Sequence, residues 1–324
     1  MAGLLRNGIA LLTVVLGVLA SVVASAAEIR LSPIKLTPHV YYFKGEPGMA
    51  SAANKGFMSN AGFVVTRDGV VVFDALATPA LGEAMIKAIR KITPLPIRHV
   101  IVSHYHADHF YGLQPLKAAG AEIWAHQNAQ AYIDSDSARE RLAQRRQALA
   151  PWVDEKTQLL PADRWLDFNG AKTLRFELGG LHFRVIDTSG AHSSDDLMLA
   201  VEEDAMLFAG DLFFTGRIPF VGNADSKIWL EALDRMLEVK PRMVVPGHGD
   251  ASTRSIEDMQ LTRDYLVFLR KEMGNAVADL IPFEEAYAKT DWSTFEKYPA
   301  FQQANRLNAY GTYILMEKES LQQK

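Results

Sequence analysis

The chain from residue 40 onward begins with three short apolar runs that are separated by turn residues. The runs are VYYF (40–43), GFVV (62–65) and VVVF (70–73), and Arg67-Asp68-Gly69 divides the last two. Short apolar runs bounded by glycine and aspartate are typical of β-strands. The pattern therefore predicts three strands, with a glycine-containing loop over residues 46–60 between the first and the second.

A helical period follows these strands. Thr78 is suited to cap a helix, and Pro79 is suited to its first position. Four apolar residues then recur on one stripe: Leu81, Met85, Ile89 and Ile92. Pro94 and Pro96 are expected to end this helix, because proline cannot continue the helical hydrogen bonding.

The next segments alternate between the two patterns. HVIVSH (99–104) and AEIWAH (121–126) predict strands on either side of a helix-like stretch that reaches Ala119. Further on, two pairs of apolar runs meet at Gly179-Gly180 and at residues 202–204, and each pair predicts a hairpin. Strands followed by helices in both halves of the chain favour an α/β protein in which two sheets form the core and helices lie outside.

The last part of the chain becomes increasingly helical. Trp229, Leu233 and Leu237 share one helical face, and MVVPGH (243–248) predicts a final strand. From Ser255 to the C-terminus the pattern predicts two or three helices. Residues 127–165 are rich in arginine, glutamine, alanine and aspartate with only a weak apolar stripe. We interpret them as a helical insertion in a domain over residues 27–254, followed by a helical extension over residues 255–324.

Composition excludes several classes of function. The chain has 324 residues, a net charge of -4 and no cysteine. The absence of a basic excess argues against a nucleic-acid partner and favours a small-molecule substrate. Without cysteine, any bound metal must be held by histidine and carboxylate side chains. The sequence leaves the oligomeric state open.

The N-terminal residues have the layout of an export signal. Arg6 precedes an apolar run over residues 8–23, and Ala24-Ser25-Ala26 resembles a cleavage site. The pattern predicts a signal peptide over residues 1–26 and a periplasmic or secreted mature chain without a stable membrane span. An uncleaved anchor is the alternative, because the run is close to the roughly 20 residues that cross a bilayer.

The strongest chemical signal is the segment His104-Tyr105-His106-Ala107-Asp108-His109, which follows a buried strand. Imidazole and carboxylate groups suit Zn²⁺, and four candidate ligands within six residues cannot all lie on one face of a strand. His104 and His106 could chelate one ion while Asp108 and His109 serve another. Three further candidates each lie in a glycine-containing turn near a strand end: His192, Asp211 and His248.

These motifs, together with Asp74 at a strand end, resemble the metallo-β-lactamase superfamily from about Val40 to Asp250. The resemblance implies a four-layer αβ/βα sandwich. It also implies that His104, His106 and His192 bind one zinc ion, that Asp108, His109 and His248 bind a second, and that Asp211 bridges the two. Asp74 would then fix the HxHxDH loop through hydrogen bonds.

The resemblance also implies a mechanism. Two zinc ions would lower the pKa of a shared water, and the resulting hydroxide would attack a carbonyl group. Asp108 would be the catalytic residue that orients this nucleophile or shuttles its proton. The expected function is therefore hydrolysis of a small thioester, ester, lactone or lactam.

Within the superfamily, the layout resembles most the periplasmic metallohydrolases linked to quinoprotein and sulfur-oxidation systems. Two departures from the cysteine-containing β-lactamases weaken a β-lactamase assignment: Asp211 stands at their cysteine position, and Phe214 stands where their lysine grips the antibiotic. Arg217 could offer a substitute partner for a carboxylate. A β-lactamase therefore remains one alternative, and a diiron persulfide dioxygenase or another redox enzyme is the other, since the same ligands can hold iron.

The remaining histidines fit structural roles better than ligation: His39, His99, His126 and His182. For a group of apolar residues the sequence leaves a substrate pocket and the hydrophobic core equally open: Phe57, Met58, Tyr105, Phe110, Tyr111, Phe214 and Phe220.

Overall fold

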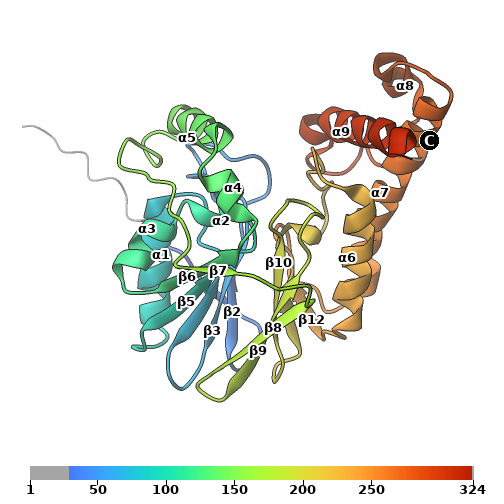
Figure 1. Cartoon of the computed structure of the whole chain (residues 1–324). Helices are drawn as coiled ribbons and strands as arrows, with labels where there is room; N and C mark the ends of the chain where they lie inside the picture. Colours follow the sequence, from blue (N-terminus) through green and yellow to red (C-terminus); the bar gives the residue numbers. More distant parts are fainter. Residues whose placement is uncertain (1–28, 323–324) are drawn as a thin grey trace, which may run out of the picture.

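The structure is a computed structural model that describes residues 29–322. The expected signal peptide over residues 1–26 lies outside the described residues. Two sheets face each other, and helices cover their outer faces (Figure 1). This arrangement confirms the predicted α/β sandwich of four layers.

The first sheet has seven strands in sequence order. Its strands are β1 (Ile34–Lys35), β2 (Val40–Phe43), β3 (Ala61–Val65), β4 (Val70–Phe73), β5 (Ile97–Ile101), β6 (Glu122–His126) and β7 (Arg164–Leu166). Strands β1 to β4 pair antiparallel, and β4 to β7 pair parallel. The parallel strands all direct their carboxyl ends to one edge of the sheet, which is where such sheets place their sites.

The second sheet has five strands in the order β12-β11-β10-β9-β8. Its strands are β8 (Thr173–Leu178), β9 (Leu181–Asp187), β10 (Leu197–Val201), β11 (Met206–Phe208) and β12 (Met243–Val245). Both hairpins predicted from the sequence are present as the pairs β8–β9 and β10–β11. Strand β12 pairs parallel with β11, so the turn after each strand opens toward the same end of the molecule.

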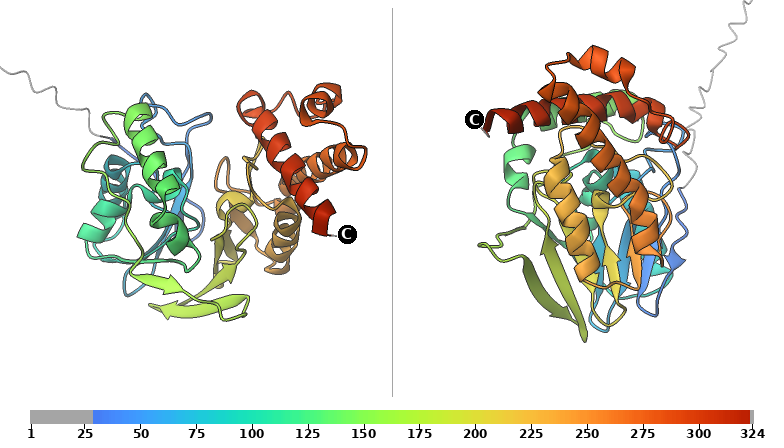
Figure 2. Two further views of the ribbon diagram at one scale, coloured as in Figure 1. Left: turned by 45° about the horizontal axis from the view of Figure 1, so that its top comes forward. Right: turned by 90° about the vertical axis from the view of Figure 1, so that its right-hand side faces the viewer.

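The helices form the outer layers and one end of the molecule. They are α1 (Pro79–Arg90), α2 (Ala107–Phe110), α3 (Leu113–Ala118), α4 (Ala129–Ile133), α5 (Asp136–Ala148), α6 (Ser226–Glu238), α7 (Ser255–Ala278), α8 (Phe283–Lys289) and α9 (Phe301–Gln322), with a 3-10 turn η1 (Gly210–Leu212). Helices α6 and α7 lie along the second sheet, and α9 crosses the end of that half (Figure 2). Within the described residues, no helix combines the length and the apolar character that a membrane span requires.

Three apolar layers stabilise the sandwich. Strand β4 contributes side chains to two of them. Val70 and Val72 pack toward α1, whereas Val71 and Phe73 pack into the layer between the two sheets. Alternate side chains of a strand point to opposite faces, so a strand that is covered on both sides must be apolar throughout. The run VVVF is therefore the sequence of a central strand, and all four residues are buried.

The structure differs from the sequence prediction at two places. Helix α1 ends at Arg90, so Ile92 lies beyond it and is 38% exposed. The segment over residues 127–165 contains α4 and α5, but Arg164 and Trp165 at its end belong to β7 of the first sheet. Strand β7 has only three residues and lacks the apolar run that would identify it as a strand in the sequence. The C-terminal prediction of two or three helices corresponds to three, α7 to α9.

Candidate metal centre

The HxHxDH segment leaves the first sheet directly after β5. Residues 102–106 continue the chain in an irregular loop, and α2 begins at Ala107, so the Asp108 and His109 side chains project from a helical turn. A chain that changes from strand to loop to helix within six residues points its side chains in several directions. This local structure lets one short segment direct candidate ligands toward two positions.

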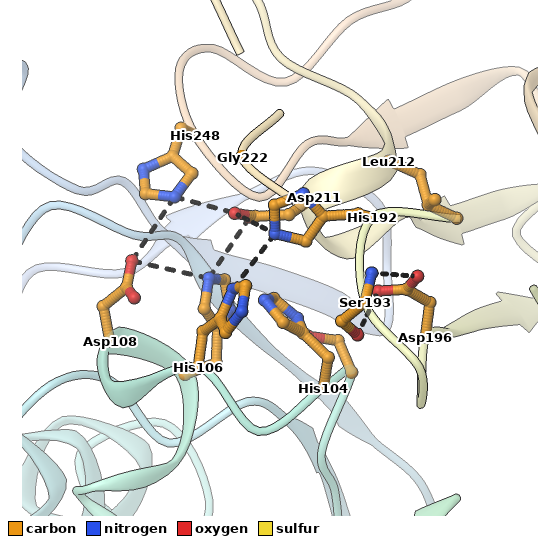
Figure 3. Close-up of polar contacts among 12 residues, drawn as sticks. His104, His106, Asp108, His192, Ser193, Asp196, Asp211, Leu212, Gly222 and His248 are labelled. Carbon is orange, nitrogen blue, oxygen red and sulfur yellow. Dashed lines mark hydrogen bonds and ion pairs between the residues drawn. The ribbon is translucent and has the colours of Figure 1, made fainter. Parts of the chain in front are cut away.

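The other three candidates reach the same place from the second sheet. His192 follows β9, Asp211 lies in η1 after β11, and His248 follows β12. Figure 3 shows these side chains opposite the HxHxDH loop, with the polar groups of both halves turned toward one another. The structure therefore brings all seven predicted ligands together across the junction of the two sheets.

The seven side chains divide into two groups. In each group, one candidate ligand atom per residue lies within 4.8 Å of the others. The first group is His104, His106, His192 and Asp211, and the second is Asp108, His109 and His248. This division separates the two trios of histidine and aspartate side chains that the resemblance implies, and it places Asp211 with the first trio.

Asp211 faces both groups at once. Its Oδ2 atom lies 3.5 Å from Nε2 of His192, and its Oδ1 atom lies 3.2 Å from Nε2 of His109 and 3.4 Å from Nε2 of His248. The carboxylate is 5% exposed. Each of its two oxygens is thus directed at a different group, which is the arrangement that a bridging ligand needs.

The second ring nitrogen of three histidines is held by the protein. Nδ1 of His104 lies 2.9 Å from Oγ of Ser103, and Nδ1 of His248 lies 2.8 Å from the carbonyl oxygen of Met58. Nδ1 of His109 lies 2.8 Å from Oδ2 of Asp74. Such contacts orient the imidazole rings and leave Nε2 free to bind a metal.

Buried atoms without partners mark the centre of the cluster. Among the described residues, Nε2 of His104, Nε2 of His109 and Oδ1 of Asp211 are buried and make no hydrogen bond. Unsatisfied buried polar atoms are costly and rare in native proteins. Nitrogen and carboxylate donors that converge in this way suit Zn²⁺ or another borderline divalent cation. The residues present could therefore hold such a metal.

The charges of the cluster are unevenly distributed. Burial lowers the pKa of His192 to about 3 and that of His104 well below its usual value. Burial also opposes the charged form of His109, but the carboxylates of Asp211, Asp108 and Asp74 outweigh it and raise this pKa. The His248 and His109 imidazoles in turn overcome the effect of burial on Asp211 and lower its pKa well below the usual value. Asp211 therefore stays ionised within the cluster, and its negative charge favours a cation beside it.

Asp74 fixes the HxHxDH loop through contacts with Ser103 and His109. Its Oδ1 accepts from the backbone N–H of Ser103 at 2.7 Å, and its Oδ2 accepts from Oγ of Ser103 at 2.9 Å as well as contacting His109. Asp74 adopts a φ of 64°, a strained value for a residue other than glycine. The structure thus uses a strained residue to fix both ends of the loop.

Replacing Asp74 with asparagine is expected to weaken metal binding by about 10-fold to 100-fold, the usual effect of losing a partner behind a metal-ligating histidine. Asparagine tolerates the positive φ and can still accept from Ser103, but its amide group cannot serve as the charged acceptor for Nδ1 of His109. Competition with a chromophoric chelator measures the affinity. Unchanged affinity in Asp74→Asn would show that Asp74 only caps a turn.

Several residues that the sequence does not single out support the cluster. Asn60 donates to the carbonyl oxygens of Pro246 and Gly249, on either side of His248, at 2.8 and 2.9 Å. Ser59 donates to the carbonyl oxygen of Asp108 at 2.6 Å. Asp195 accepts from the backbone N–H of Tyr105 at 2.9 Å. Single polar residues in loops carry no periodic signal, so no sequence pattern could have singled out Ser59 or Asn60.

The remaining histidines lie outside both groups. His39 contacts Asp204 at 3.0 Å, His182 contacts Glu203 at 2.6 Å, and His99 pairs with Glu122 at 3.2 Å. Nδ1 of His126 accepts from the backbone N–H of Asn128 at 3.1 Å. These contacts agree with the structural roles expected from the sequence.

Most of the apolar residues near the motifs belong to the core. Tyr105, Phe110 and Tyr111 are each about 1% exposed and pack in the layer beneath α1. Phe214 is fully buried and stacks on His248 with ring centroids 5.2 Å apart. Only Phe57 and Phe220 of this set are partly exposed.

Comparison with known proteins identifies the family. Residues 54–248 match the family model for the metallo-beta-lactamase superfamily. A protein named metallo-beta-lactamase type 2 from Bacteroides fragilis is 24% identical over 215 residues, which cover 64% of this chain and 76% of that protein. The metallo-beta-lactamase fold-containing protein ST1585 from Sulfurisphaera tokodaii is 26% identical over 180 residues, which cover 50% of this chain and 64% of that protein.

Solved structures share the fold at low sequence identity. A metallo-beta-lactamase from Pontibacter korlensis superposes with a TM-score of 0.56 at 20% identity, covering 72% of this chain and 98% of that one. The sec-alkylsulfatase Pisa1 from Pseudomonas sp. superposes with a TM-score of 0.65 at 18% identity and covers 87% of this chain, which spans only half of that enzyme. These structures show the fold, and the family match over residues 54–248 establishes that the chain belongs to the metallo-beta-lactamase superfamily and is a metal-dependent hydrolase.

Proposed function

We propose that the chain is a dinuclear zinc hydrolase that cleaves a small carbonyl substrate such as a thioester, an ester, a lactone or a lactam. The observation that carries this proposal is Asp211, whose two carboxylate oxygens face two separate groups of ligands. A single metal ion would leave one of these groups unused. The match to the superfamily over residues 54–248 supports the same reading.

The proposed ligands follow the two groups. His104, His106 and His192 would hold one zinc ion, Asp108, His109 and His248 would hold the other, and Asp211 would lie between them. When bound, the two ions would lower the pKa of a water molecule and polarise the carbonyl oxygen of the substrate. Residues 27–254 would form the catalytic domain, with residues 255–324 as a helical extension.

Asp108 is the residue that we assign to proton transfer. Its side chain is 15% exposed, whereas Asp211 is 5% exposed, so Asp108 is the more accessible of the two carboxylates. The His109 and His248 imidazoles outweigh burial and lower the pKa of Asp108, which keeps the carboxylate ionised. Its carboxylate would orient the attacking water and accept the proton that this water loses when it adds to the carbonyl carbon.

Hydrolysis of a β-lactam is a second candidate. The Bacteroides fragilis relative is named a metallo-beta-lactamase, and this observation favours it. Against it, the position of the substrate-binding lysine of the cysteine-containing enzymes is occupied here by Phe214, which is fully buried against His248. An apolar ring in this place cannot pair with the carboxylate of an antibiotic. We therefore place β-lactam opening behind thioester, ester and lactone hydrolysis.

We further propose that the mature chain acts in the periplasm or outside the cell. The support is the sequence pattern at the N-terminus, in which an apolar run over residues 8–23 leads into Ala24-Ser25-Ala26.

A substrate panel with metal analysis tests the function. The purified protein is expected to contain zinc rather than iron and to hydrolyse an acetyl thioester, an ester or a lactone faster than a cephalosporin. Removal of the metal with a chelator should abolish turnover, and added zinc should restore it. Iron as the bound metal would favour a redox enzyme. Turnover that survives complete loss of metal would contradict the hydrolase proposal altogether.

A further inference from the structure

The loop over residues 214–225, which connects η1 to α6, is joined at both ends to turns that carry candidate ligands. At one end, the N–H of Thr215 donates to the carbonyl oxygen of His248 at 3.2 Å. At the other end, the N–H of Asp225 donates to the carbonyl oxygen of the residue that precedes His192, at 3.0 Å. The loop therefore contacts one ligand turn from each of the two groups.

Two aromatic rings beside the loop pack directly on these imidazoles. Phe214, at the start of the loop, stacks on His248 with ring centroids 5.2 Å apart and an interplanar angle of 5°. Trp229, in the first turn of α6, has its ring centroid 5.1 Å from that of His192, and its Nε1 donates to the carbonyl oxygen of Leu212 at 2.9 Å. Both aromatic side chains are fully buried. A shift of the loop would therefore disturb groups that pack on both histidines.

The middle of the loop is held by Asn308, a residue of the C-terminal helix α9. Its Oδ1 accepts from the backbone N–H groups of Val221 and Gly222 at 2.8 and 3.2 Å. Its Nδ2 donates to the carbonyl oxygen of Pro219 at 2.8 Å and to the hydroxyl oxygen of Tyr265 in α7 at 3.1 Å. Asn308 is 1% exposed, and backbone polar groups in such a place need a partner within the protein. One side chain thus satisfies three backbone groups of the loop.

Two further contacts join the C-terminal extension to the same stretch of the loop. The N–H of Ile218 donates to the carbonyl oxygen of Pro299, just before α9, at 3.0 Å. At Gly311 in α9, a Cβ atom would lie 1.7 Å from the carbonyl oxygen of Gly222, so only glycine allows the helix to come this close. All of these contacts come from residues beyond the segment 54–248 that matches the family model.

We propose that the C-terminal extension supports the metal centre, and that Asn308 is a positioning residue that acts through the 214–225 loop on the imidazoles of His192 and His248. Helix α9 would thus influence ligands of both groups without contacting a metal ion. Such coupling is reciprocal: if the contacts of Asn308 favour metal binding, then metal binding must stabilise those contacts to the same extent. This inference rests on the metal centre of the proposed function and extends it to a helix outside the matched segment.

The zinc affinity of two asparagine variants tests the positioning role. Asn308→Ala removes the three contacts with the loop, and zinc affinity should fall by about 10-fold, the lower end of the range for losing the support of a metal ligand. Asn305→Ala is the matched control, because Asn305 is equally buried on the same helix but bonds to Tyr265 and Tyr287 of the extension. It should keep the affinity of the wild type, even where both variants lose similar thermal stability without metal. Competition with a chromophoric chelator measures the affinities, and an equal effect of both substitutions would overturn the positioning role.

Gly311→Ala disturbs the same contact from a second residue. The added methyl group would displace the carbonyl oxygen of Gly222, whereas alanine itself suits a helix, so this variant serves if Asn308→Ala fails to fold. The visible absorption spectrum of the cobalt-loaded proteins reports the geometry of the ligands. Gly311→Ala and Asn308→Ala should both change this spectrum, and Asn305→Ala should not. A wild-type cobalt spectrum in folded Gly311→Ala would contradict the proposal.

Hydrogen exchange of the wild-type protein tests the reciprocal effect without a substitution. Added zinc should slow exchange at the amides of Val221 and Gly222 more than in strand β8, which lies at the far edge of the second sheet. Asn308→Ala should lose most of this difference. Exchange in the loop that does not respond to zinc would overturn the inference. These measurements need no substrate, so if zinc binds but no member of the substrate panel is hydrolysed, the proposed function fails while the exchange result still decides the role of Asn308.

Discussion

Replacing Asp211 with alanine is expected to reduce hydrolysis by about three orders of magnitude or more and to lower the metal content of the protein. The Asp211 oxygens face both groups of ligands, so the substitution removes a donor from each. A metal centre contributes several kcal/mol to stabilising the charge of a transition state, and each 1.36 kcal/mol corresponds to about a tenfold change in rate. Elemental analysis and turnover with the best substrate of the panel measure the two effects.

Asp250→Ala is the matched control for this variant. Asp250 is an exposed carboxylate that pairs with Lys44 at the surface, and it belongs to neither group of ligands. Its loss should leave metal content and turnover unchanged. Far-ultraviolet circular dichroism should show that Asp211→Ala remains folded, because the substitution removes a polar side chain of the site and no apolar side chain of the core. An Asp211→Ala protein with a full complement of metal and normal turnover would contradict the bridging assignment.

Gly247→Ala is expected to damage the centre without removing any ligand. A Cβ atom at this position would lie 1.9 Å from Oδ1 of Asp211 and 2.8 Å from the backbone of Gly210. The added methyl group cannot fit unless the carboxylate moves. We expect metal affinity to fall by at least about 10-fold to 100-fold, as it does when the support of a ligand is lost, and overpacking should lower the free energy of unfolding by roughly 1 to 3 kcal/mol.

Gly274→Ala gives the comparison for this second variant. Gly274 lies inside helix α7, where the nearest atom to an added Cβ is the flexible end of Met316 at 3.0 Å. Alanine is the better helix former, so Gly274→Ala should be neutral or slightly stabilising. Titration of the metal-free proteins with zinc compares the affinities. If Gly247→Ala binds zinc as the wild type does, the close approach of this glycine to Asp211 has no consequence for the site.

The sequence was sufficient to predict the framework of the molecule because the framework depends on regular patterns. Buried strands such as VVVF are apolar throughout, and the hairpin at Gly179-Gly180 has a strong turn signal. The HxHxDH segment and the single ligands after later strands were recognisable because histidine and aspartate recur there in a fixed order. The family match over residues 54–248 confirms the superfamily that these motifs indicated.

The details that escaped prediction depend on contacts between distant segments. Asn60 supports the His248 loop from almost 190 residues away, and Asn308 reaches Val221 over a separation of 87 residues. Neither asparagine belongs to a periodic pattern. Ile92 matched the helical stripe, yet the helix ended at Arg90 before reaching it. Pairings of this kind arise only once the chain has folded, so local sequence patterns cannot reveal them.

The position of the cluster at the seam of the sandwich has a consequence for the whole molecule. His104, His106, Asp108 and His109 come from one sheet, whereas His192, Asp211 and His248 come from the other. Cations bound there would link the two halves in addition to the apolar layer between the sheets and the hydrogen bonds between their loops, so their binding free energy would also stabilise the contact between the halves. The amount of bound metal would therefore determine the stability of the folded protein as well as its hydrolytic activity.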